Sequence, residues 1–485
     1  MDEDMDFESG SGPAPQTVPQ QIPQRNGVQM DGDPGRKMLD LVFVQDCTGS
    51  QGSYISSATR NIEQICAHIF ESGKLQMTED LRVGLVAFRD HPPQDHTYIV
   101  KNFGFSSDIS KVQKDLSTLY ASGGGDGPEA VTAALSEALN MEWREYATKM
   151  VVLIADAPPH GIGEYGDGAF KFSSCLVITW GSPTDMAGFD DGSPDGCDPI
   201  HIARAMASRG ITLFFVACEP ALSGYQYAND FYKAITNITS GLMLPLTTAD
   251  LLAHAIVASV LENLDMERLV REVGAAVAQR ILGNNESVDD VARELHEKLL
   301  LRNESTKKVV IESIYKDSDE SRHNVAVFME APSLAEARPH LKRVIGTRFT
   351  DKYLQARAAL ARGSYSYSSS YSPATPPRSP PAKAVSTPSP STSPQRKIVS
   401  DFAAFGAPKN ASVFGTAVAS SPFSLAGGKA AFGGMRTGPS RASFDDDEDD
   451  DEEDSRQKIE LREGSISLEQ AKRIAMQSAW RSARA

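Results

Sequence analysis

Apolar runs alternate with amphipathic stretches along the first half of this chain. Short runs rich in Val, Leu, Ile and Phe predict buried strands at 39–45, 81–88, 150–155 and 211–217. Apolar residues that recur every three or four positions predict helices at 54–72, 109–120, 128–142 and 201–208. Strands joined by helical crossovers of this length form a mostly parallel sheet with helices on both faces. The pattern therefore predicts a doubly wound α/β fold.

The second half has a different organisation. A continuous helical pattern covers 249–302, and in 305–362 we expect paired strands at 309–314 and 324–329 and then a helix through 349–360. A Gly-, Pro- and Asp-rich excursion at 157–198 contains one predicted strand, 175–180. The predicted domains are a disordered N-terminus (1–35), an α/β domain (37–264), a helical and mixed region (265–362), a disordered linker with an acidic block (363–460) and a basic amphipathic, coiled-coil-like C-terminal helix (461–485).

The linker is dense in Ser, Pro and Gly and lacks core-forming residues. Proline follows Thr375, Ser379, Thr387, Ser389 and Ser393, which suggests phosphorylation by proline-directed kinases. The closing helix carries Lys472, Arg473, Arg481 and Arg484, and we expect it to fold only on a partner or against the acidic block at 445–454.

Composition limits the class of protein. The net charge is −16, but the acidic block holds ten of the acids, so the remainder carries −16 + 10 = −6 and makes no case for nucleic-acid binding. Five scattered cysteines indicate reduced thiols and an intracellular, cytoplasmic setting. The acidic start is unlike a signal peptide, and no apolar stretch is long enough to span a membrane.

Side chains with oxygen atoms lie at three places next to the predicted strands and helices. Asp46, Thr48 and Ser50 come directly after the first strand, Asp126 lies in the loop before a helix, and Asp156 ends the strand at 150–155. Because parallel strands end at one edge of a sheet, we expect these side chains to converge. Three carboxylates and two hydroxyls suit a hard divalent cation, Mg²⁺ or Mn²⁺.

This set resembles the metal-ion-dependent adhesion site of von Willebrand factor type A (VWFA) domains, which uses Asp-x-Ser-x-Ser with a Thr and an Asp from later loops. Thr48 stands in place of the first Ser, and Asp126 lies near the usual Thr. The resemblance covers roughly 37–264. The runs FRDHPPQD (88–95) and GGGDGPEA (123–130) are most similar to the intracellular branch found beside alpha-kinases, although no second half here resembles the kinase domain. The resemblance to VWFA domains implies that this chain binds a protein partner, often through a carboxylate of that partner, and that it is not an enzyme.

Simpler roles compete with these assignments. Asp46 and Asp126 could cap the following helices. His91, Asp95 and His96, with His160 and Cys47, form a possible zinc set, but we favour a structural role in which Asp90 and His91 brace a loop made rigid by Pro92 and Pro93. The glycine loop lacks the Gly-Lys-Ser/Thr ending of a phosphate loop. We interpret Cys47 as buried packing rather than a nucleophile.

The sequence therefore predicts a non-enzymatic, metal-dependent protein-binding domain with a phosphorylated tail. Asp126 adds negative charge, which works against an acidic partner. Two alternatives stay open: a metal-dependent enzyme or kinase-associated factor in phosphoryl transfer, and a scaffold that acts through its tail.

Overall fold

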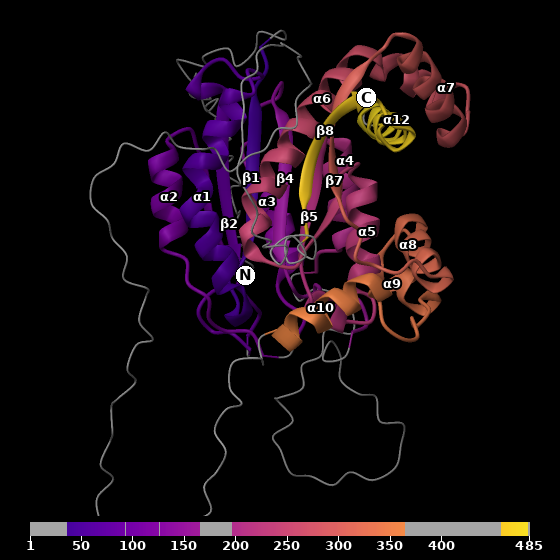
Figure 1. The fold of residues 1–485 in the computed structure, drawn as a ribbon. Coiled ribbons are helices and arrows are strands. Elements are labelled where there is room, and N and C mark those ends of the chain that lie inside the picture. Colours follow the sequence, from indigo (N-terminus) through magenta and orange to yellow (C-terminus); the bar gives the residue numbers. More distant parts are fainter. Residues whose placement is uncertain (1–35, 93, 126, 165–195, 364–456, 484–485) are drawn as a thin grey trace, which may run out of the picture.

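The computed structural model describes residues 36–92, 94–125, 127–164, 196–363 and 457–483. Within them, a six-stranded sheet has the order β3-β2-β1-β4-β5-β6, with β3 antiparallel and the other strands parallel (Figure 1). Its strands are β1 Leu39–Asp46, β2 Leu81–Phe88, β3 Val100–Ser106, β4 Thr148–Ala155, β5 Ile211–Cys218 and β6 Met243–Leu246. The predicted doubly wound α/β fold is confirmed.

Helices cover both faces of this sheet. On one face lie α1 (Gly52–Glu71), α2 (Ile109–Ser117) and the first half of α6 (Leu252–Ala278). The other face is covered by α3 (Val131–Leu139), α4 (Pro199–Ser208) and α5 (Ala228–Ile238). Every residue of β1 is buried, and β1 pairs with β2 on one side and β4 on the other, so β1 is the centre of the core.

Two strands of the sheet were not expected from the hydrophobic pattern. β3 is an edge strand whose side chains are all at least partly exposed, so its sequence lacks an apolar run. β6 has only four residues and includes Pro245, which a strand tolerates at an edge because proline has no N–H to donate.

The mixed region, residues 305–362, does not contain the predicted pairing of strands 309–314 and 324–329. Residues 324–329 are not a strand: they lie in α8 (Asp319–Glu330), where the Ser318 hydroxyl accepts a hydrogen bond from the amide of Ser321 and fixes the helix start. The other predicted strand exists as β7 (Ser305–Ile311), but its partner is β8 (Ile459–Ser465). The remaining helices are α7 Val288–Leu301, α9 Leu334–Ala337, α10 Asp351–Gly363 and α12 Leu468–Ser482.

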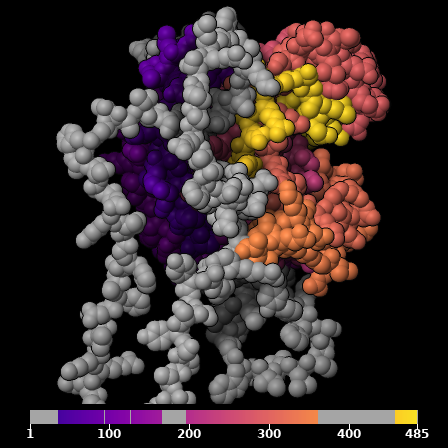
Figure 2. Space-filling model, in the orientation of Figure 1, coloured from indigo at the N-terminus to yellow at the C-terminus, as the bar shows by residue number. Residues whose placement is uncertain are grey.

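The C-terminal segment, defined as residues 457–483, folds back onto the rest of the chain. β8 pairs with β7 over seven residues, and α12 packs against α6, α7 and α4 (Figures 1 and 2). Ile474 and Ala475 of α12 are fully buried and belong to the same hydrophobic cluster as Leu269 of α6 and Leu299 of α7. A helix is thus present within the predicted range 461–485, but residues 461–465 belong to β8, and α12 packs on this chain's own helices without a separate partner.

Several predictions lie outside the described residues: the disordered N-terminus, the strand at 175–180, Asp126, and the linker with its acidic block and Ser/Thr-Pro sites. Among the helices that are described, none is long and apolar enough to cross a membrane.

Candidate metal-binding site

The loop after β1 brings three of the predicted ligands together. Asp46 is fully buried, and its Oδ1 accepts hydrogen bonds from the Thr48 amide (2.8 Å) and the Thr48 hydroxyl (2.7 Å). Ser50 is exposed and lies two residues before the start of α1 at Gly52. One buried carboxylate therefore fixes the loop, while the next hydroxyl faces outward.

The glycine loop packs directly on this first loop. The Gly49 amide donates to the Gly123 carbonyl (3.2 Å), and the Ser122 amide donates to the Cys47 carbonyl (3.0 Å). Gly123 and Gly124 have φ of 82° and 80°, a conformation that residues with a Cβ rarely adopt. Glycine is required here because the backbone turns in the left-handed region against the side chains of Asp95 and Thr48.

Replacing Gly123 by alanine should destabilise this loop, because the new Cβ would lie 2.0 Å from Oδ2 of Asp95. We expect a loss of about 1–3 kcal/mol in the free energy of unfolding from strain and steric conflict together. Equilibrium urea denaturation measures it. Gly73→Ala is the matched control, since Gly73 has φ of 68° but a Cβ there would meet nothing within 4 Å. Equal losses in the two variants would show that the contact with Asp95 has no role.

Asp156 completes the described part of the cluster. It follows β4, the neighbour of β1 in the sheet, and is 8% exposed. A cleft at this edge is lined by Thr48, Ser50, Gly123–125, Glu129, Asp156 and Tyr225, among others. The structure thus gathers Asp46, Thr48, Ser50 and Asp156 at one edge of the sheet, while Asp126 lies outside the described residues.

Asp46 is a fully buried acid whose negative charge is unfavourable in this environment. Burial, followed by repulsion from Asp156, raises the pKa of Asp46 to about 7, against the lowering effect of the Thr48 hydrogen bonds. Oδ2 of Asp46 is buried and, within the described parts of the chain, accepts no hydrogen bond. A cation at this edge would supply the missing partner for that oxygen and the missing positive charge. The donor set fits a hard divalent cation on both counts.

Two residues at this cleft were not among the predicted ligands. Glu129 is buried, its amide donates to the Pro158 carbonyl (2.9 Å), and its Oε1 lies close to Gly124. Tyr225 reaches across from the segment after β5, and its hydroxyl donates to the Gly127 carbonyl (2.9 Å). Glu129 stands inside the glycine motif, so its position was a usable signal. Nothing in the local sequence around Tyr225 points to the site.

Within the described residues, Arg89 and Asp90 join the loop after β2 to neighbouring loops of the site. Arg89 is fully buried; it donates to the Thr97 hydroxyl (2.8 Å) and the Tyr120 carbonyl (3.0 Å) and lies against the rings of Tyr98 and Tyr120. Asp90 Oδ1 accepts the His91 amide and contacts His160 Nε2 at 2.8 Å. These contacts match the structural role that we favoured for Asp90 and His91.

No group of three or more His, Cys, Asp or Glu side chains is placed to hold a metal ion in the described ranges. The hydroxyl ligands Thr48 and Ser50 are not among these four residue types, and Asp126 lies outside the described residues. Cys47 is fully buried, and burial raises the pKa of its thiol to about 12, so it stays protonated at neutral pH.

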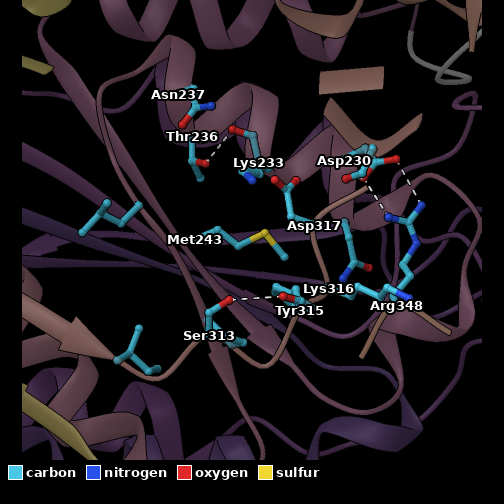
Figure 3. A pocket seen from close by; sticks show the side chains of 15 residues that line it. Asp230, Lys233, Thr236, Asn237, Met243, Ser313, Tyr315, Lys316, Asp317 and Arg348 are labelled. Atoms are coloured by element: carbon cyan, nitrogen blue, oxygen red, sulfur yellow. Dashed lines mark hydrogen bonds and ion pairs between the residues drawn. The ribbon is translucent and has the colours of Figure 1, made fainter. Parts of the chain in front are cut away.

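A second cavity, of about 300 Å³, lies between α5, β6 and the mixed region (Figure 3). Its Asp230 carboxylate pairs with Arg348 (2.7 Å) and accepts hydrogen bonds from Ser321 (2.6 Å) and Asn324 (2.8 Å). The ion pair therefore serves the fold by joining the mixed region to α5.

In the comparisons with known proteins, parts of this chain are similar to parts of other proteins. No family model matches it. An ariadne-like RING finger protein of Acanthamoeba polyphaga mimivirus is 27% identical over 214 residues, 44% of this chain and 19% of that protein. The alpha-protein kinase vwkA of Dictyostelium discoideum is 33% identical over 124 residues, 25% of this chain and 19% of the kinase. The chain thus matches about a fifth of the length of these curated relatives.

Solved structures align at low similarity. The pilus adhesin SpaC of Lactobacillus rhamnosus GG, in its open conformation, aligns with a TM-score of 0.34 and 13% identity over 48% of this chain and 30% of SpaC. An aerotolerance-related membrane protein of Bacteroides fragilis aligns with a TM-score of 0.28 and 14% identity over 46% of this chain and 98% of that protein. At these scores the alignments carry no argument about function.

Proposed function

We propose that this chain is a non-enzymatic, intracellular protein-binding module that uses a divalent cation, Mg²⁺ or Mn²⁺, at the edge of its sheet. Asp46, Thr48, Ser50 and Asp156 would hold the cation, with Asp126 from the glycine loop. When bound, the cation supplies a Lewis-acidic position that accepts an oxygen from a protein partner. The observation that carries this proposal is Oδ2 of Asp46, which is buried and has no hydrogen-bond partner among the described residues, next to a cleft that Thr48, Ser50, Glu129 and Asp156 line.

One further feature supports a partner that carries an anionic oxygen. The N-terminus of α1 lies next to Ser50 and contributes the positive end of its helix dipole. Thr48 and Ser50 are neutral ligands, but Asp46, Asp126 and Asp156 are three carboxylates, one more than a divalent cation needs for neutrality, so the ligands of this chain work against that preference. The partial similarity to the alpha-protein kinase vwkA supports the intracellular VWFA branch as the source of this arrangement.

The Ser50 hydroxyl offers a direct test of the cation site. Ser50→Ala should weaken Mg²⁺ binding about tenfold, which corresponds to about 1.4 kcal/mol, because one direct oxygen ligand is lost. A thermal-shift titration with Mg²⁺ measures this, and Ser53→Ala is the matched control because Ser53 is also exposed and lies one helical turn further along α1. Melting curves of the unmodified chain that are identical in Mg²⁺ and in EDTA would refute the proposal.

Affinity capture tests the partner. Proteins retained by the unmodified chain in Mg²⁺, released by EDTA and not retained by Ser50→Ala are the expected partners. Retention that ignores both the chelator and the substitution would assign binding to another surface.

The linker at 364–456 connects α10 to the C-terminal segment, which packs on the domain. We propose that proline-directed phosphorylation of this linker regulates the module. A deletion from 363 onward would also remove β8 and α12, so a test of the linker has to keep 457–483 in place.

A further inference from the structure

A second cleft, of about 740 Å³, lies at the sheet edge opposite the candidate metal site, where β4 and β5 begin. Four cationic side chains line it: Lys149 of β4, Arg209 after α4, Arg271 of α6 and Arg481 of α12. The lining acids are Glu145 and Glu267, so the formal balance is 4 − 2 = +2. This local excess stands out in a chain whose net charge is −16.

The hydrogen bonds of these cations leave most of their charge uncompensated. Lys149 Nζ donates to the Glu145 carbonyl (2.9 Å), and Arg209 Nη1 donates to the Leu139 carbonyl (2.9 Å), so both are held by neutral groups. Arg271 and Arg481 share one carboxylate, that of Glu267, at 2.8 and 2.6 Å. Nε of Arg481 is buried and has no hydrogen-bond partner among the described residues.

The backbone at Gly210 holds the Arg481 side chain in this position. Its guanidinium lies on Gly210, where a Cβ would fall 2.6 Å from Nε, and its Nη2 donates to the Gly210 carbonyl (3.3 Å). The positive charges also affect Lys149. Burial, and then the charge of Arg481, lowers the pKa of the Lys149 ammonium group. An anion in the cleft would relieve this repulsion.

We propose that this cleft binds a phosphate-type oxyanion. Such a ligand brings the missing negative charge and several acceptors to guanidinium N–H groups, for which arginine geometry is well suited. It would contact β4 through Lys149, the turn between α4 and β5 through Arg209, α6 through Arg271 and the C-terminal segment through Arg481. Binding would therefore hold α12 against the sheet. The cavity of Figure 3 differs, because there Asp230 compensates Arg348 within the fold.

The test is a pyrophosphate titration of the full chain in EDTA, at constant ionic strength maintained with chloride, so that the metal site takes no part. Pyrophosphate should raise the melting temperature and slow hydrogen exchange in α12. Arg209→Glu should lose at least about nine-tenths of the binding constant, which corresponds to about 1.4 kcal/mol. Arg60→Glu is the matched control, since Arg60 is exposed on α1 and also donates to a backbone carbonyl.

Lys149→Gln provides a second, independent loss of affinity. An equal response of Arg209→Glu, Lys149→Gln and the unmodified chain, or an equal response to chloride alone, overturns the proposal. Two arms separate the sources of the phosphate group. Displacement of pyrophosphate by a 383–395 peptide phosphorylated at Ser389, but not by the unmodified peptide, assigns the cleft to the chain's own linker; no displacement assigns it to free phosphate species.

Discussion

Replacing Asp46 by asparagine should stabilise the metal-free chain and abolish its stabilisation by Mg²⁺. The carboxylate is fully buried, lies near Asp156 and has an Oδ2 without a hydrogen bond in the described part of the chain, so its charge costs free energy in the fold. A rise in pKa from 3.8 to about 7 corresponds to an upper value of about 4 kcal/mol at alkaline pH. Asparagine removes the charge and keeps an acceptor for Thr48.

The pH dependence has a definite sign. Between pH 4 and pH 7, roughly the span from the ordinary pKa of Asp46 to its raised value, the folded chain holds a proton that the unfolded chain has released. The stability of the metal-free protein should therefore fall as pH rises through this window. Asp46→Asn should lack this fall, so the two proteins should differ most near pH 8 and little near pH 4.

Equilibrium urea denaturation in EDTA at several pH values measures both effects, and the same series in Mg²⁺ measures the loss of cation stabilisation. Asp250→Asn removes an exposed carboxylate and is the control for a general change in charge. If Asp46→Asn were less stable than the unmodified chain at pH 8 in EDTA, the buried charge would be compensated by a group that the described residues do not show.

Removal of the Arg473 guanidinium should be the most damaging single change in the C-terminal segment. Arg473 pairs with Glu262 of α6, a carboxylate 1% exposed, and also donates to the Ser240 carbonyl (2.8 Å). Among the described residues, Arg473→Ala would leave the buried Glu262 carboxylate with the Val309 amide and the Gln470 side chain as its hydrogen-bond donors. We expect a loss of about 3–5 kcal/mol in the free energy of unfolding.

A double variant without either charge separates the effect of the ion pair from that of its surroundings. Glu262→Gln combined with Arg473→Met removes both charges and should recover much of the stability that Arg473→Ala loses. Arg293→Ala breaks an exposed ion pair with Asp290 and should cost less than about 1 kcal/mol. A cost for Arg473→Ala as small as that of Arg293→Ala would mean that the Arg473–Glu262 pair does not hold α12 in place.

The central strands could be predicted because burial on both faces leaves a clear mark in the sequence. β1, β2, β4 and β5 are apolar runs, and each lies between two layers of helices. β7 was also visible, but its partner was not. β8 follows β7 by almost 150 residues, and its alternating exposed residues, such as Glu460 and Arg462, give no apolar run. The local sequence of neither strand indicates that β7 and β8 pair over that separation.

The same reasoning applies to the candidate site. Asp46, Thr48, Ser50 and Asp156 follow strands whose positions were predictable, so their convergence at one edge followed from topology alone. Tyr225 reaches the cleft because the segment after β5 turns back toward Gly127, and no pattern in the sequence sets that turn. The cluster of Arg271 and Arg481 was hidden for a related reason: it depends on where α12 packs.

The return of the C-terminal segment also affects how a nascent chain completes this fold. When a ribosome has made residue 363, β7 lacks its partner and the apolar stripe of α6 and α7 lacks its cover. Synthesis of the next 120 residues, through 483, takes on the order of 6–24 s at the usual speed of translation. During that interval the surface that β8 and α12 later cover is open to chaperones. It is also open to the same segment of a neighbouring chain on the same messenger RNA.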